Sequence, residues 1–514
     1  MASRPLVLLI IDGFGVSDIK IGNAVLMARK PTWDTLLANY PHALLQASGE
    51  AVGMDWGESG NSEVGHLAIG SGRIVKHYSA IINSAIKDGS FSQNPALLGA
   101  IEHAQKHNSK LHLAGLLTSG AVHAHFDHLV ALLDLVEKSN VSQVYLHLFT
   151  DGKDGAAFES EQLLKHLSEH LKDSSKVKLA TLVGRDFAMA RNLDWDRTKI
   201  AYDMLVNGVG ERAADLAVAV AEKHQQNISD AVMPALISGQ ADNFTITEND
   251  AIIFFNFREE RMRQLTRAFS ESGFANFPAK VFTNLFITTF TPYLDNTNHH
   301  VAFYPPAVEN NLPEVLSLNG KKQYHLAESE KAAHVTLFFN GLHNKPYTGE
   351  EDFIIDSPHD LIKEPQMRCA DIAQKAAAVL ATNENDFMVV NFANADMLSH
   401  LGDVNLTVKG VEFVDDALST LYQAVKKAGG TLVVTADHGN AESVVYSTSG
   451  EKETRHNNNP VPFCLIDDNY QGQAWPEGIN GILADVAPTI LELMGLPIST
   501  EMTGQSLLRL LKVN

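Results

Sequence analysis

Six acidic or histidine side chains follow short apolar runs or lie in polar loops, and their types suit metal binding. They are Asp12, Asp396, His400, Asp437, His438 and His456. In open α/β sheets ligands bind outside the carboxyl ends of the strands, so residues that follow strands should converge on one edge. Carboxylate and imidazole ligands with no cysteine nearby favour Mn²⁺ or Zn²⁺ over Ca²⁺. A solvated loop residue is a reasonable alternative for any one of them, but a poor one for the set.

The spacing of these residues indicates how they could share ions. Asp396 and His400 are four residues apart, so a helix that begins there would place both on one face. Asp437 and His438 are adjacent and cannot share a helix face, but on a tight turn they can point towards two neighbouring ions. His456 lies in a polar Arg-His-Asn-Asn-Asn-Pro segment, which suits a further ligand.

Ser62 is the candidate nucleophile. It lies in Gly60-Asn61-Ser62-Glu63-Val64-Gly65-His66, after a glycine-rich loop. We expect Ser62 to be the N-cap of a helix with Glu63 in the first turn, where exposed N–H groups and the helix dipole favour an anion. A metal ion would lower the pKa of its hydroxyl and make it a usable nucleophile. Taken alone, a plain capping serine is the commoner role for such a residue.

Short apolar runs rich in Val, Ile, Leu and Phe are typical of buried strands, and helical patterns such as Asp371–Leu380 and Val411–Ala428 separate most of them. Strands that alternate with helices predict parallel α/β sheets. The expected strands are Leu6–Ile11, Leu111–Thr118, Val144–Thr150, Lys178–Val183, Ala251–Phe257, Val281–Thr288, His334–Phe339, Phe387–Phe392 and Leu432–Thr435.

The distribution of these residues divides the chain into two domains. The Asp and His residues that follow strands lie near the two ends of the sequence, whereas the middle carries most of the paired arginines. This predicts one α/β domain split in sequence, 1–76 and 304–514, with a second α/β domain, 77–303, inserted into it. The joints are expected near Gly72–Tyr78 and in the proline-containing Pro292–Pro306. Two domains joined by two short linkers are expected to form a monomer that hinges.

Composition narrows the function classes. The 61 acidic and 40 basic residues give a net charge of −21, which argues against nucleic acid or an anionic membrane surface as the main partner. The two cysteines, Cys369 and Cys464, cannot form a disulfide framework and predict a reducing compartment, the cytoplasm. The run Leu6–Ile11 is too short for the core of a signal peptide, and no run is long enough to cross a bilayer.

Several motifs resemble those of the cofactor-independent phosphoglycerate mutases, a family of the alkaline phosphatase superfamily. The motifs are Asp12-Gly13-Phe14-Gly15, Asn61 to His66, Asn391-Phe392-Ala393-Asn394, Asp396-Met397 with His400, Thr435 to Glu442, and His456 before Asn459-Pro460-Val461-Pro462. The resemblance covers essentially the whole chain. It implies an alkaline-phosphatase-like parallel sheet domain that binds two Mn²⁺ ions, with a substrate-binding domain inserted into it.

The resemblance also implies roles for individual residues. One Mn²⁺ would be bound by Asp396, His400 and His456, and the other by Asp12, Ser62, Asp437 and His438, with Ser62 becoming phosphorylated. The substrate residues implied are His123, Lys153, Asp154, Arg185, Arg191, Arg258, Arg261 and Lys331. Lys331 would stabilise the transferring phosphoryl group, and Asp154 would accept a proton from the receiving hydroxyl. Guanidinium groups suit both the carboxylate and the phosphate of phosphoglycerate.

The predicted function is therefore interconversion of 3-phosphoglycerate and 2-phosphoglycerate through a phosphoserine, without 2,3-bisphosphoglycerate. The sequence departs from the family pattern at substrate positions and keeps every metal ligand. The departures are Lys153 for arginine, Gly155-Ala156-Ala157 without the usual proline, Asp186-Phe187 for two tyrosines, Ala190 for aspartate, Ala395 for proline, and Ala121 and Ala124 beside His123. The alternatives are a metal-dependent phosphatase or sugar-phosphate mutase of the same superfamily, and a binding protein on a decayed enzyme scaffold. Arg263 and Arg267 are expected to be ordinary surface residues.

Overall fold

The computed structural model describes residues 4–294, 298–304 and 308–511 and divides the chain into two compact units. Unit 1 comprises Met1–His77 and Pro306–Asn514, and unit 2 comprises Tyr78–Pro305. Residues 295–297 and 305–306 of the joint expected at Pro292–Pro306 lie outside the described residues.

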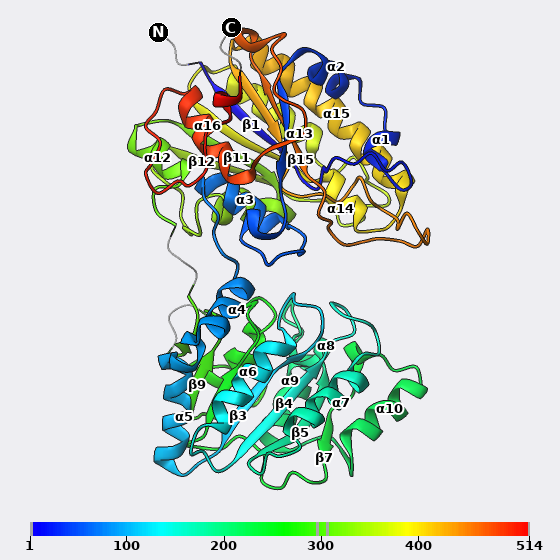
Figure 1. The fold of residues 1–514 in the computed structure, drawn as a ribbon, viewed down its shortest axis with the longest axis vertical. Coiled ribbons are helices and arrows are strands. Elements are labelled where there is room, and N and C mark those ends of the chain that lie inside the picture. The colour runs from blue at the N-terminus through cyan, green and yellow to red at the C-terminus, as the bar shows by residue number, and fades with distance from the viewer. Residues whose placement is uncertain (1–3, 295–297, 305–307, 512–514) are drawn as a thin grey trace. The chain divides into compact units, whose positions relative to one another are not determined.

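Unit 1 is built on an eight-stranded sheet in the order β12-β11-β13-β1-β14-β15-β2-β16 (Figure 1). The strands β12, β11, β13, β1 and β14 are parallel neighbours, whereas β15 runs antiparallel to both β14 and β2. The bounds are β1 Leu6–Ile11, β2 His42–Gln46, β11 Gln323–Glu328, β12 Glu350–Ile355, β13 Phe387–Phe392, β14 Thr431–Thr435, β15 Val461–Ile466 and β16 Ile479–Ile482. Each residue of β1, β13 and β14 is buried, as expected of parallel strands covered on both faces.

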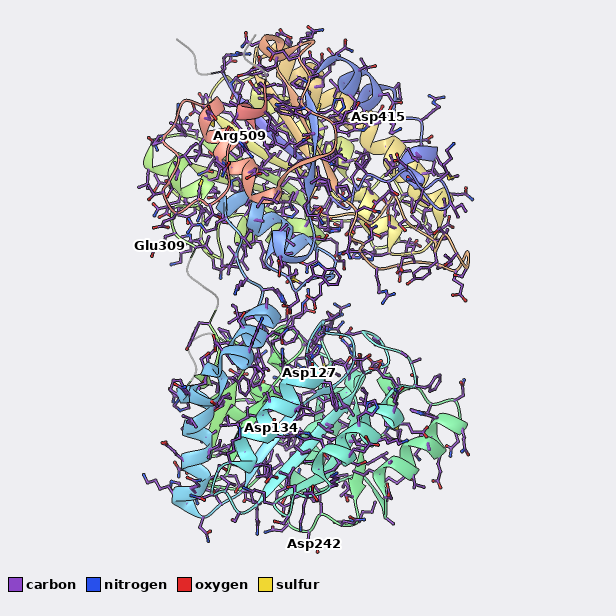
Figure 2. All side chains as sticks on the ribbon, viewed as in Figure 1. Asp127, Asp134, Asp242, Glu309, Asp415 and Arg509 are labelled. Carbon is purple, nitrogen blue, oxygen red and sulfur yellow. The ribbon has the colours of Figure 1, made fainter. Side chains whose placement is uncertain are left out.

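Two groups of helices pack around this sheet. The first group contains α1 Ala24–Met27, α2 Pro31–Asn39, α13 Cys369–Leu380, α14 Asn394–Ser399 and α15 Val404–Lys427, and the second contains α3 Ser62–Ser71, α12 Leu312–Leu318 and α16 Val486–Leu493. Figure 1 shows the two groups on opposite sides of β1. Asp415 of α15, labelled in Figure 2, accepts hydrogen bonds from the backbone N–H groups of Thr32 (3.0 Å) and Trp33 (2.8 Å). It therefore caps α2, whose own N-cap side chain makes no capping bond.

Unit 2 carries a second eight-stranded sheet, in the order β10-β9-β8-β3-β4-β5-β7-β6. The neighbours β9, β8, β3, β4 and β5 are parallel. The strands are β3 Leu111–Leu117, β4 Val144–Thr150, β5 Val177–Gly184, β6 Glu211–Ala213, β7 Leu236–Ser238, β8 Ala251–Phe254, β9 Phe286–Thr289 and β10 His300–Val301. The helices are α4 Tyr78–Asp88, α5 Pro95–His107, α6 Phe126–Glu137, α7 Ser160–Leu171, α8 Arg185–Ala188, α9 Trp195–Asn207, α10 Leu216–Gln225 and α11 Arg263–Ser270.

One predicted strand is wrong. The run expected as the strand His334–Phe339 forms a π-helix over His334–Phe338 instead. Its buried residues Val335 and Phe339 are four apart, which is the spacing of a helix face. The expected strands Ala251–Phe257 and Val281–Thr288 are shorter than predicted, since β8 ends at Phe254 and β9 begins at Phe286.

Candidate functional site

The predicted metal ligands of unit 1 meet at one edge of its sheet. Asp12 follows β1, Asp396 lies in α14 just after β13, and Asp437 and His438 follow β14. Because β1, β13 and β14 are parallel neighbours, their carboxyl ends lie together. The structure thus brings these four residues to one place, and it adds His400 and His456 beside Asp396.

Close backbone approach explains two glycines of the quoted motifs. Gly13 has a φ of +68°, and a Cβ there would lie 2.8 Å from the Cα of Asp396. A Cβ on Gly65 would lie 2.5 Å from the carbonyl oxygen of Asp437, so α3 can pack this tightly only because the residue is glycine. Gly13 therefore lets the loop after β1 approach α14, and Gly65 lets α3 approach the segment after β14.

Ser62 is the first residue of α3. The expectation that it is the N-cap of this helix is wrong. The cap is Asn61, whose side chain accepts a hydrogen bond of 3.1 Å from the N–H of Val64. Capping therefore falls to Asn61, and the Ser62 hydroxyl is left to face the acidic cluster. Ser62 is 6% exposed, so its surroundings are almost closed to water.

The hydroxyl of Ser62 contacts a lysine, a carboxylate and a histidine. Its Oγ is 2.9 Å from Lys331 Nζ, 3.2 Å from Asp12 Oδ1 and 3.0 Å from His438 Nε2. The ammonium donates to Oγ, and Asp12 can accept the hydroxyl proton, whereas His438 can accept it only when its ring is neutral. A serine so placed can lose its proton to a neighbour while its developing charge is stabilised.

Lys331 is a buried cation at the end of the short 3-10 helix Ser329–Lys331, which follows β11. Its Nζ also lies 2.6 Å from Asp12 Oδ1 and 2.7 Å from Asp396 Oδ2. Burial lowers the pKa of Lys331, but the surrounding carboxylates outweigh that effect and hold it above its ordinary value. Burial likewise raises the pKa of Asp12, but Lys331 and His438 bring it below its usual range, so both groups stay charged.

Asp396, His400 and His456 form the first group of converging acceptors. The Nδ1–H groups of His400 and His456 donate to the carbonyl oxygens of Thr454 (2.7 Å) and Gly60 (3.1 Å). Each Nε2 therefore presents a lone pair. These two atoms are only 3.2 Å apart, and they lie 3.3 and 3.4 Å from Asp396 Oδ1. Three acceptors can face one another in this way only around a proton or a cation.

Asp437 and His438 form a second group with Asp12. Asp437 Oδ2 is buried, and no described residue donates a hydrogen bond to it. His66 Nδ1 is 3.2 Å away, but its proton is directed to the carbonyl oxygen of Ser62 at 2.9 Å. Burial lowers the pKa of His438, but Asp437, Asp12 and Asp396 reverse this and raise it to about 9. The cluster therefore holds extra positive charge in the form of a proton.

These observations test whether the residues fit divalent metal ions. The three aspartates are at most 2% exposed, each group combines carboxylate oxygens with imidazole nitrogens, and an orphaned acceptor remains on Asp437. Asp396, His400 and His456 bring three possible ligand atoms within 4.8 Å of one another, as do the overlapping sets Asp12, Asp396, His438 and Asp12, His66, Asp437. Unpaired buried charges of one sign are costly, and metal ions remove that cost, so the donor set fits.

Two residues that support this cluster were missed as site residues, although both lie in quoted motifs. Asn391 Nδ2 donates to Asp12 Oδ2 at 2.8 Å and lies 3.0 Å from His66 Nε2. The other ring nitrogen of His66, Nδ1, bonds to the carbonyl oxygen of Ser62, so His66 links Asn391 to the backbone of Ser62. Asn391 and His66 thus hold Asp12 and Ser62 in position by hydrogen bonds, as the hydrogen-bond partners of metal-bound carboxylates do.

The predicted substrate residues of unit 2 gather after β3, β4, β5 and β8. Asp151, which follows β4, organises the turn: its carboxylate accepts from the backbone N–H groups of Lys153 (3.2 Å) and Asp154 (3.1 Å) and from Arg185 Nη1 (2.5 Å). Asp151 is fully buried, and Arg185 is 3% exposed. Asp151 therefore fixes both the turn and the guanidinium group, a role that sequence reasoning did not assign to it.

His123 and Asp154 form a closely hydrogen-bonded pair. His123 Nδ1 lies 2.7 Å from Asp154 Oδ2, and Arg185 Nη1 lies 2.8 Å from Asp154 Oδ1. Burial raises the pKa of Asp154, but His123 and Arg185 outweigh it and leave the pKa below its ordinary value. The Nε2 of His123 has no hydrogen-bond partner among the described residues, although Glu260 Oε1 lies 3.9 Å away.

The remaining arginines crowd one another around Glu260. Arg258 and Arg261 lie between β8 and α11, not in the helix itself. His123 contributes most to lowering the pKa of Glu260 to about 2, and the charges of Arg258 and Arg261 add to the effect against burial. Burial lowers the pKa of Arg261, and the neighbouring charges of Arg191 and Arg185 add to the effect. Repulsion between guanidinium groups favours binding of an anion among them.

The departures at Lys153 and Asp186 are linked, because the ammonium group of Lys153 forms an ion pair with the carboxylate of Asp186. Arg263 and Arg267 behave as expected of surface residues, with ion pairs to Glu259 and Glu271 one helical turn away.

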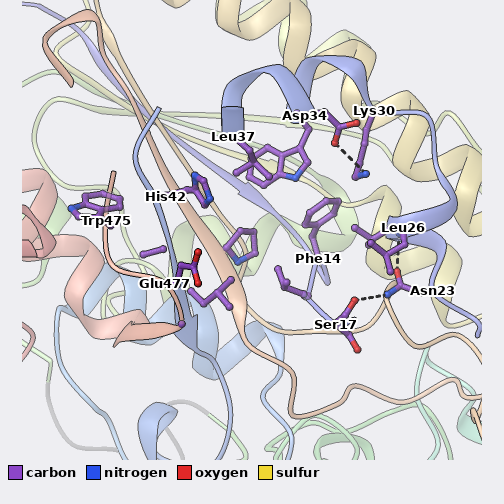
Figure 3. Close-up of a pocket in the computed structure, with 18 of the residues that line it drawn as sticks. Phe14, Ser17, Asn23, Leu26, Lys30, Asp34, Leu37, His42, Trp475 and Glu477 are labelled. Atoms are coloured by element: carbon purple, nitrogen blue, oxygen red, sulfur yellow. Dashed lines mark hydrogen bonds and ion pairs between the residues drawn. The ribbon is translucent and has the colours of Figure 1, made fainter. Parts of the chain in front are cut away.

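A cavity of about 450 Å³ in unit 1 lies apart from the predicted residues (Figure 3). Phe14, Leu26, Leu37 and Trp475 are among its apolar lining residues, and none of the predicted ligands or substrate residues lines it. Among the described residues, no helix combines the length and apolar character needed to cross a membrane.

Comparison with known proteins identifies the family. A model of the Metalloenzyme superfamily matches residues 4–498. The 2,3-bisphosphoglycerate-independent phosphoglycerate mutase of Moorella thermoacetica is 42% identical over 98% of both chains, and enzyme 1 of that name from Methanosarcina barkeri is 42% identical over 99% of this chain and 98% of its own. The chain belongs to the 2,3-bisphosphoglycerate-independent phosphoglycerate mutase family.

A solved structure supports the same assignment. The phosphoglycerate mutase of Leishmania mexicana, determined at low cobalt concentration, aligns with a TM-score of 0.81 and 26% identity and covers 100% of this chain and 98% of its own. The predicted resemblance and the predicted α/β fold class, with one domain inserted into another, are thus confirmed.

Proposed function

We propose that the protein interconverts 3-phosphoglycerate and 2-phosphoglycerate, without 2,3-bisphosphoglycerate, by moving the phosphoryl group onto Ser62 and back. The placement of Ser62 carries the proposal: at the first residue of a helix, its buried hydroxyl contacts a lysine ammonium group, a carboxylate and an imidazole. The names of the relatives supply the substrate class.

The proposal includes two divalent metal sites, for which we infer Mn²⁺. Asp396, His400 and His456 would hold one ion, and Asp12, Ser62, Asp437 and His438 would hold the other. Such ions would supply Lewis acidity, neutralising charge on the phosphoryl oxygens and favouring deprotonation of the serine.

In the first half-reaction Ser62 Oγ forms a bond to phosphorus as the bond from phosphorus to the glycerate oxygen breaks. Asp12 Oδ1 accepts the hydroxyl proton. The leaving oxygen of glycerate takes a proton from the pair of His123 and Asp154, which is then free to accept one in the second half-reaction. Lys331, which donates to Ser62 Oγ, stabilises negative charge on the transferring oxygens, the main catalytic need in phosphoryl transfer.

In the second half-reaction glycerate stays bound to the arginines of unit 2 and offers its other hydroxyl. The pair of Asp154 and His123 accepts that proton, and Arg185 holds Asp154 in place. The oxygen then takes the phosphoryl group back from Ser62. Holding glycerate throughout makes this return effectively intramolecular.

We further propose that the enzyme acts in the cytoplasm as a monomer. Both cysteines are buried and free, which suits a reducing compartment.

An enolase-coupled assay tests the function. Metal-stripped protein is given 3-phosphoglycerate with and without Mn²⁺, in the absence of 2,3-bisphosphoglycerate, and inorganic phosphate is measured in parallel. We expect Mn²⁺-dependent formation of 2-phosphoglycerate and little phosphate. Release of phosphate alone would instead indicate a phosphatase, and no turnover with any divalent metal would indicate a binding protein.

A further inference from the structure

A separate group of metal-ligand side chains lies near the amino ends of two strands of unit 1. His325 is the third residue of β11, and Glu350 and Asp352 are the first and third residues of β12. The two strands are parallel, with His325 opposite Asp352 and Gln323 opposite Glu350, so the four side chains share one face. The group is distinct from the cluster around Asp12, which follows the carboxyl end of β1.

The hydrogen bonds of Gln323 fix the proton on His325. Gln323 Nε2 donates to the carbonyl oxygen of Pro313 at 2.9 Å, so its Oε1 faces His325 Nε2, 3.4 Å away. A flipped amide would place two acceptor oxygens together at Pro313. Because Oε1 cannot donate, His325 Nε2 must carry the ring proton, which leaves Nδ1 with a lone pair.

This lone pair is aimed at two carboxylates. His325 is fully buried, and its Nδ1 has no hydrogen-bond partner among the residues described. Nδ1 lies 3.4 Å from Glu350 Oε1 and 4.0 Å from Asp352 Oδ1. Burial lowers the pKa of His325 to about 3, against a smaller opposing effect of the Val335 backbone, so the ring is neutral at physiological pH. His325 Nδ1 is thus a buried acceptor that faces other acceptors, and only a bound cation or an added proton can satisfy it.

Two hydrogen bonds hold the carboxylate of Glu350 in a position suited to binding a metal ion. Its Oε1 accepts from Asn340 Nδ2 at 2.7 Å, and its Oε2 accepts from the N–H of Tyr347 at 2.8 Å. Metal-bound histidines donate their other ring N–H to an acceptor, and metal-bound carboxylates accept further hydrogen bonds. Gln323 and Asn340 fill these two roles.

The distances agree with a metal site. Zinc bonds to histidine nitrogen and carboxylate oxygen are about 2.0–2.2 Å long, so neighbouring ligand atoms of a tetrahedron lie about 3.4 Å apart. The separation between His325 Nδ1 and Glu350 Oε1 is 3.4 Å, and all three ligand atoms lie within 4.8 Å of one another. The Asp352 side chain is 26% exposed, which leaves a route for the ion and for a water as fourth ligand.

We propose that His325, Glu350 and Asp352 form a divalent-metal site separate from the catalytic cluster, and that their nitrogen and oxygen donors select Zn²⁺. The ion ties the edge strand β12 to β11. It also reaches, through Asn340, the chain segment that runs on from Lys331.

A shared proton is the competing explanation. Burial raises the pKa of Glu350 to about 7 and also raises the pKa of Asp352. A proton held by Glu350 could satisfy His325 without any metal. The two explanations differ in the number of ions that the protein binds.

Metal counting on the full-length protein separates them. The parent and His325→Gln are loaded with Zn²⁺, freed of excess ion by gel filtration and analysed by mass spectrometry for metal per chain. His42→Gln, which changes an exposed histidine of the same unit, is the matched control. We expect His325→Gln to hold one Zn²⁺ per chain fewer than the parent and the control. Equal zinc content in all three proteins would overturn the site.

A second variant guards against misfolding of the first. Asp352→Asn changes the partly exposed ligand, and its folding is checked by circular dichroism. Removing a residue that only hydrogen-bonds to a metal ligand weakens metal binding by about tenfold or more. Removing the ligand Asp352 should therefore weaken Zn²⁺ binding at this site by at least that factor. Parent-like zinc affinity at every site in folded Asp352→Asn would contradict the assignment.

Discussion

The two units place clusters of opposite charge on equivalent parts of their sheets. In unit 1, the segments after β1, β13 and β14 bring Asp12, Asp396 and Asp437 together. Burial and a neighbouring carboxylate act to raise the pKa of Asp12 and of Asp437, and only nearby positive charge holds both pKa values below their ordinary range. In unit 2, the segments after β5 and β8 bring Arg185 and Arg261 together, and burial together with repulsion from Arg191 and Arg185 lowers the pKa of Arg261.

The difference shows that the same sheet edge can serve opposite chemistry. The fold supplies convergence at the carboxyl ends of parallel strands, and the residues just beyond those ends decide the ligand. Unit 1 is short of positive charge, which fits metal ions. Unit 2 has crowded guanidinium groups, which fit a carboxylate or phosphate. A phosphoryl mutase needs both, one to take the phosphoryl group and one to keep the glycerate.

The largest effect is expected from Ser62→Ala, which removes the acceptor from unit 1 and leaves unit 2 intact. Mutase activity should fall by at least about 10³-fold, as is common when a nucleophile is lost. Steady-state assays measure this loss, with Ser71→Ala in the same helix as control. Glycerate binding should persist, and substantial mutase activity in Ser62→Ala would remove Ser62 from the mechanism.

Arg258→Ala and Arg261→Ala test unit 2 in the same way. Each variant should lose mutase activity by about 10²-fold or more, keep its metal, and shift residual chemistry towards hydrolysis, because glycerate can escape and water can attack the phosphoserine. The ratio of inorganic phosphate to 2-phosphoglycerate and the metal content are measured together. Arg263→Ala, at an exposed ion pair, serves as control. Near-normal activity in both variants would confine the anion site to Arg185 and Arg191.

Sequence reasoning found the strand ends and the residues on them, because buried parallel strands are continuous apolar runs and the ligand types are distinctive. It could not find partners set by distant chain segments. Asn391 and His66 meet Asp12 and Ser62 only after the sheet has formed. The run at His334–Phe338 shows another limit, since a short apolar run fits a strand or a helix equally well until its packing is known.

The edge strand β12 and its neighbour β11 were also hard to predict. The strands β11 and β12 carry Gln323, His325, Glu350 and Asp352 at positions that face one another, so they lack a continuous apolar run. Asn61 took the capping role that we had given to Ser62, because asparagine caps as well as serine and the local sequence permits either.

Lys331→Met tests the excess of negative charge in the acidic cluster of unit 1. Without metal, it leaves Asp12 and Asp396 buried with no ammonium partner, which should cost about 3–5 kcal/mol of the free energy of unfolding. Added Mn²⁺ should recover more stability in this variant than in the parent. Denaturant unfolding with and without Mn²⁺ measures both effects, and Lys321→Met, at a partly exposed ion pair, is the control. Equal stability of the two variants without metal would mean that the acidic cluster lacks the predicted excess of negative charge.

Proton release on metal binding tests the excess of negative charge in the acidic cluster by titration. In the metal-free protein the pKa of His438 is raised to about 9, because nearby aspartates outweigh burial, so the ring is protonated at pH 7. A histidine ligand must be neutral, so Mn²⁺ should displace about one proton per chain at pH 7, and its affinity should rise with pH up to about 9. Activity at low Mn²⁺ should fall in mild acid and recover at high Mn²⁺. Loss in folded protein that high Mn²⁺ does not relieve would exclude ligand protonation as the cause.

The smallest effect is expected from Lys153→Arg in unit 2. Arginine can keep the ion pair with Asp186 and offers a planar fork to an anion, so kcat should hold and KM should stay the same or fall. Steady-state kinetics decide. A large loss of kcat would show that the turn has been rebuilt around lysine.

The phosphorylated serine itself tests the central claim most directly. Metal-loaded enzyme is mixed with 3-phosphoglycerate, quenched in acid within milliseconds, digested and examined by mass spectrometry. We predict a phosphoryl group on the peptide that contains Ser62, formed and lost at rates compatible with turnover. Active enzyme in which Ser62 remains unmodified at every quench time would contradict transfer through this residue.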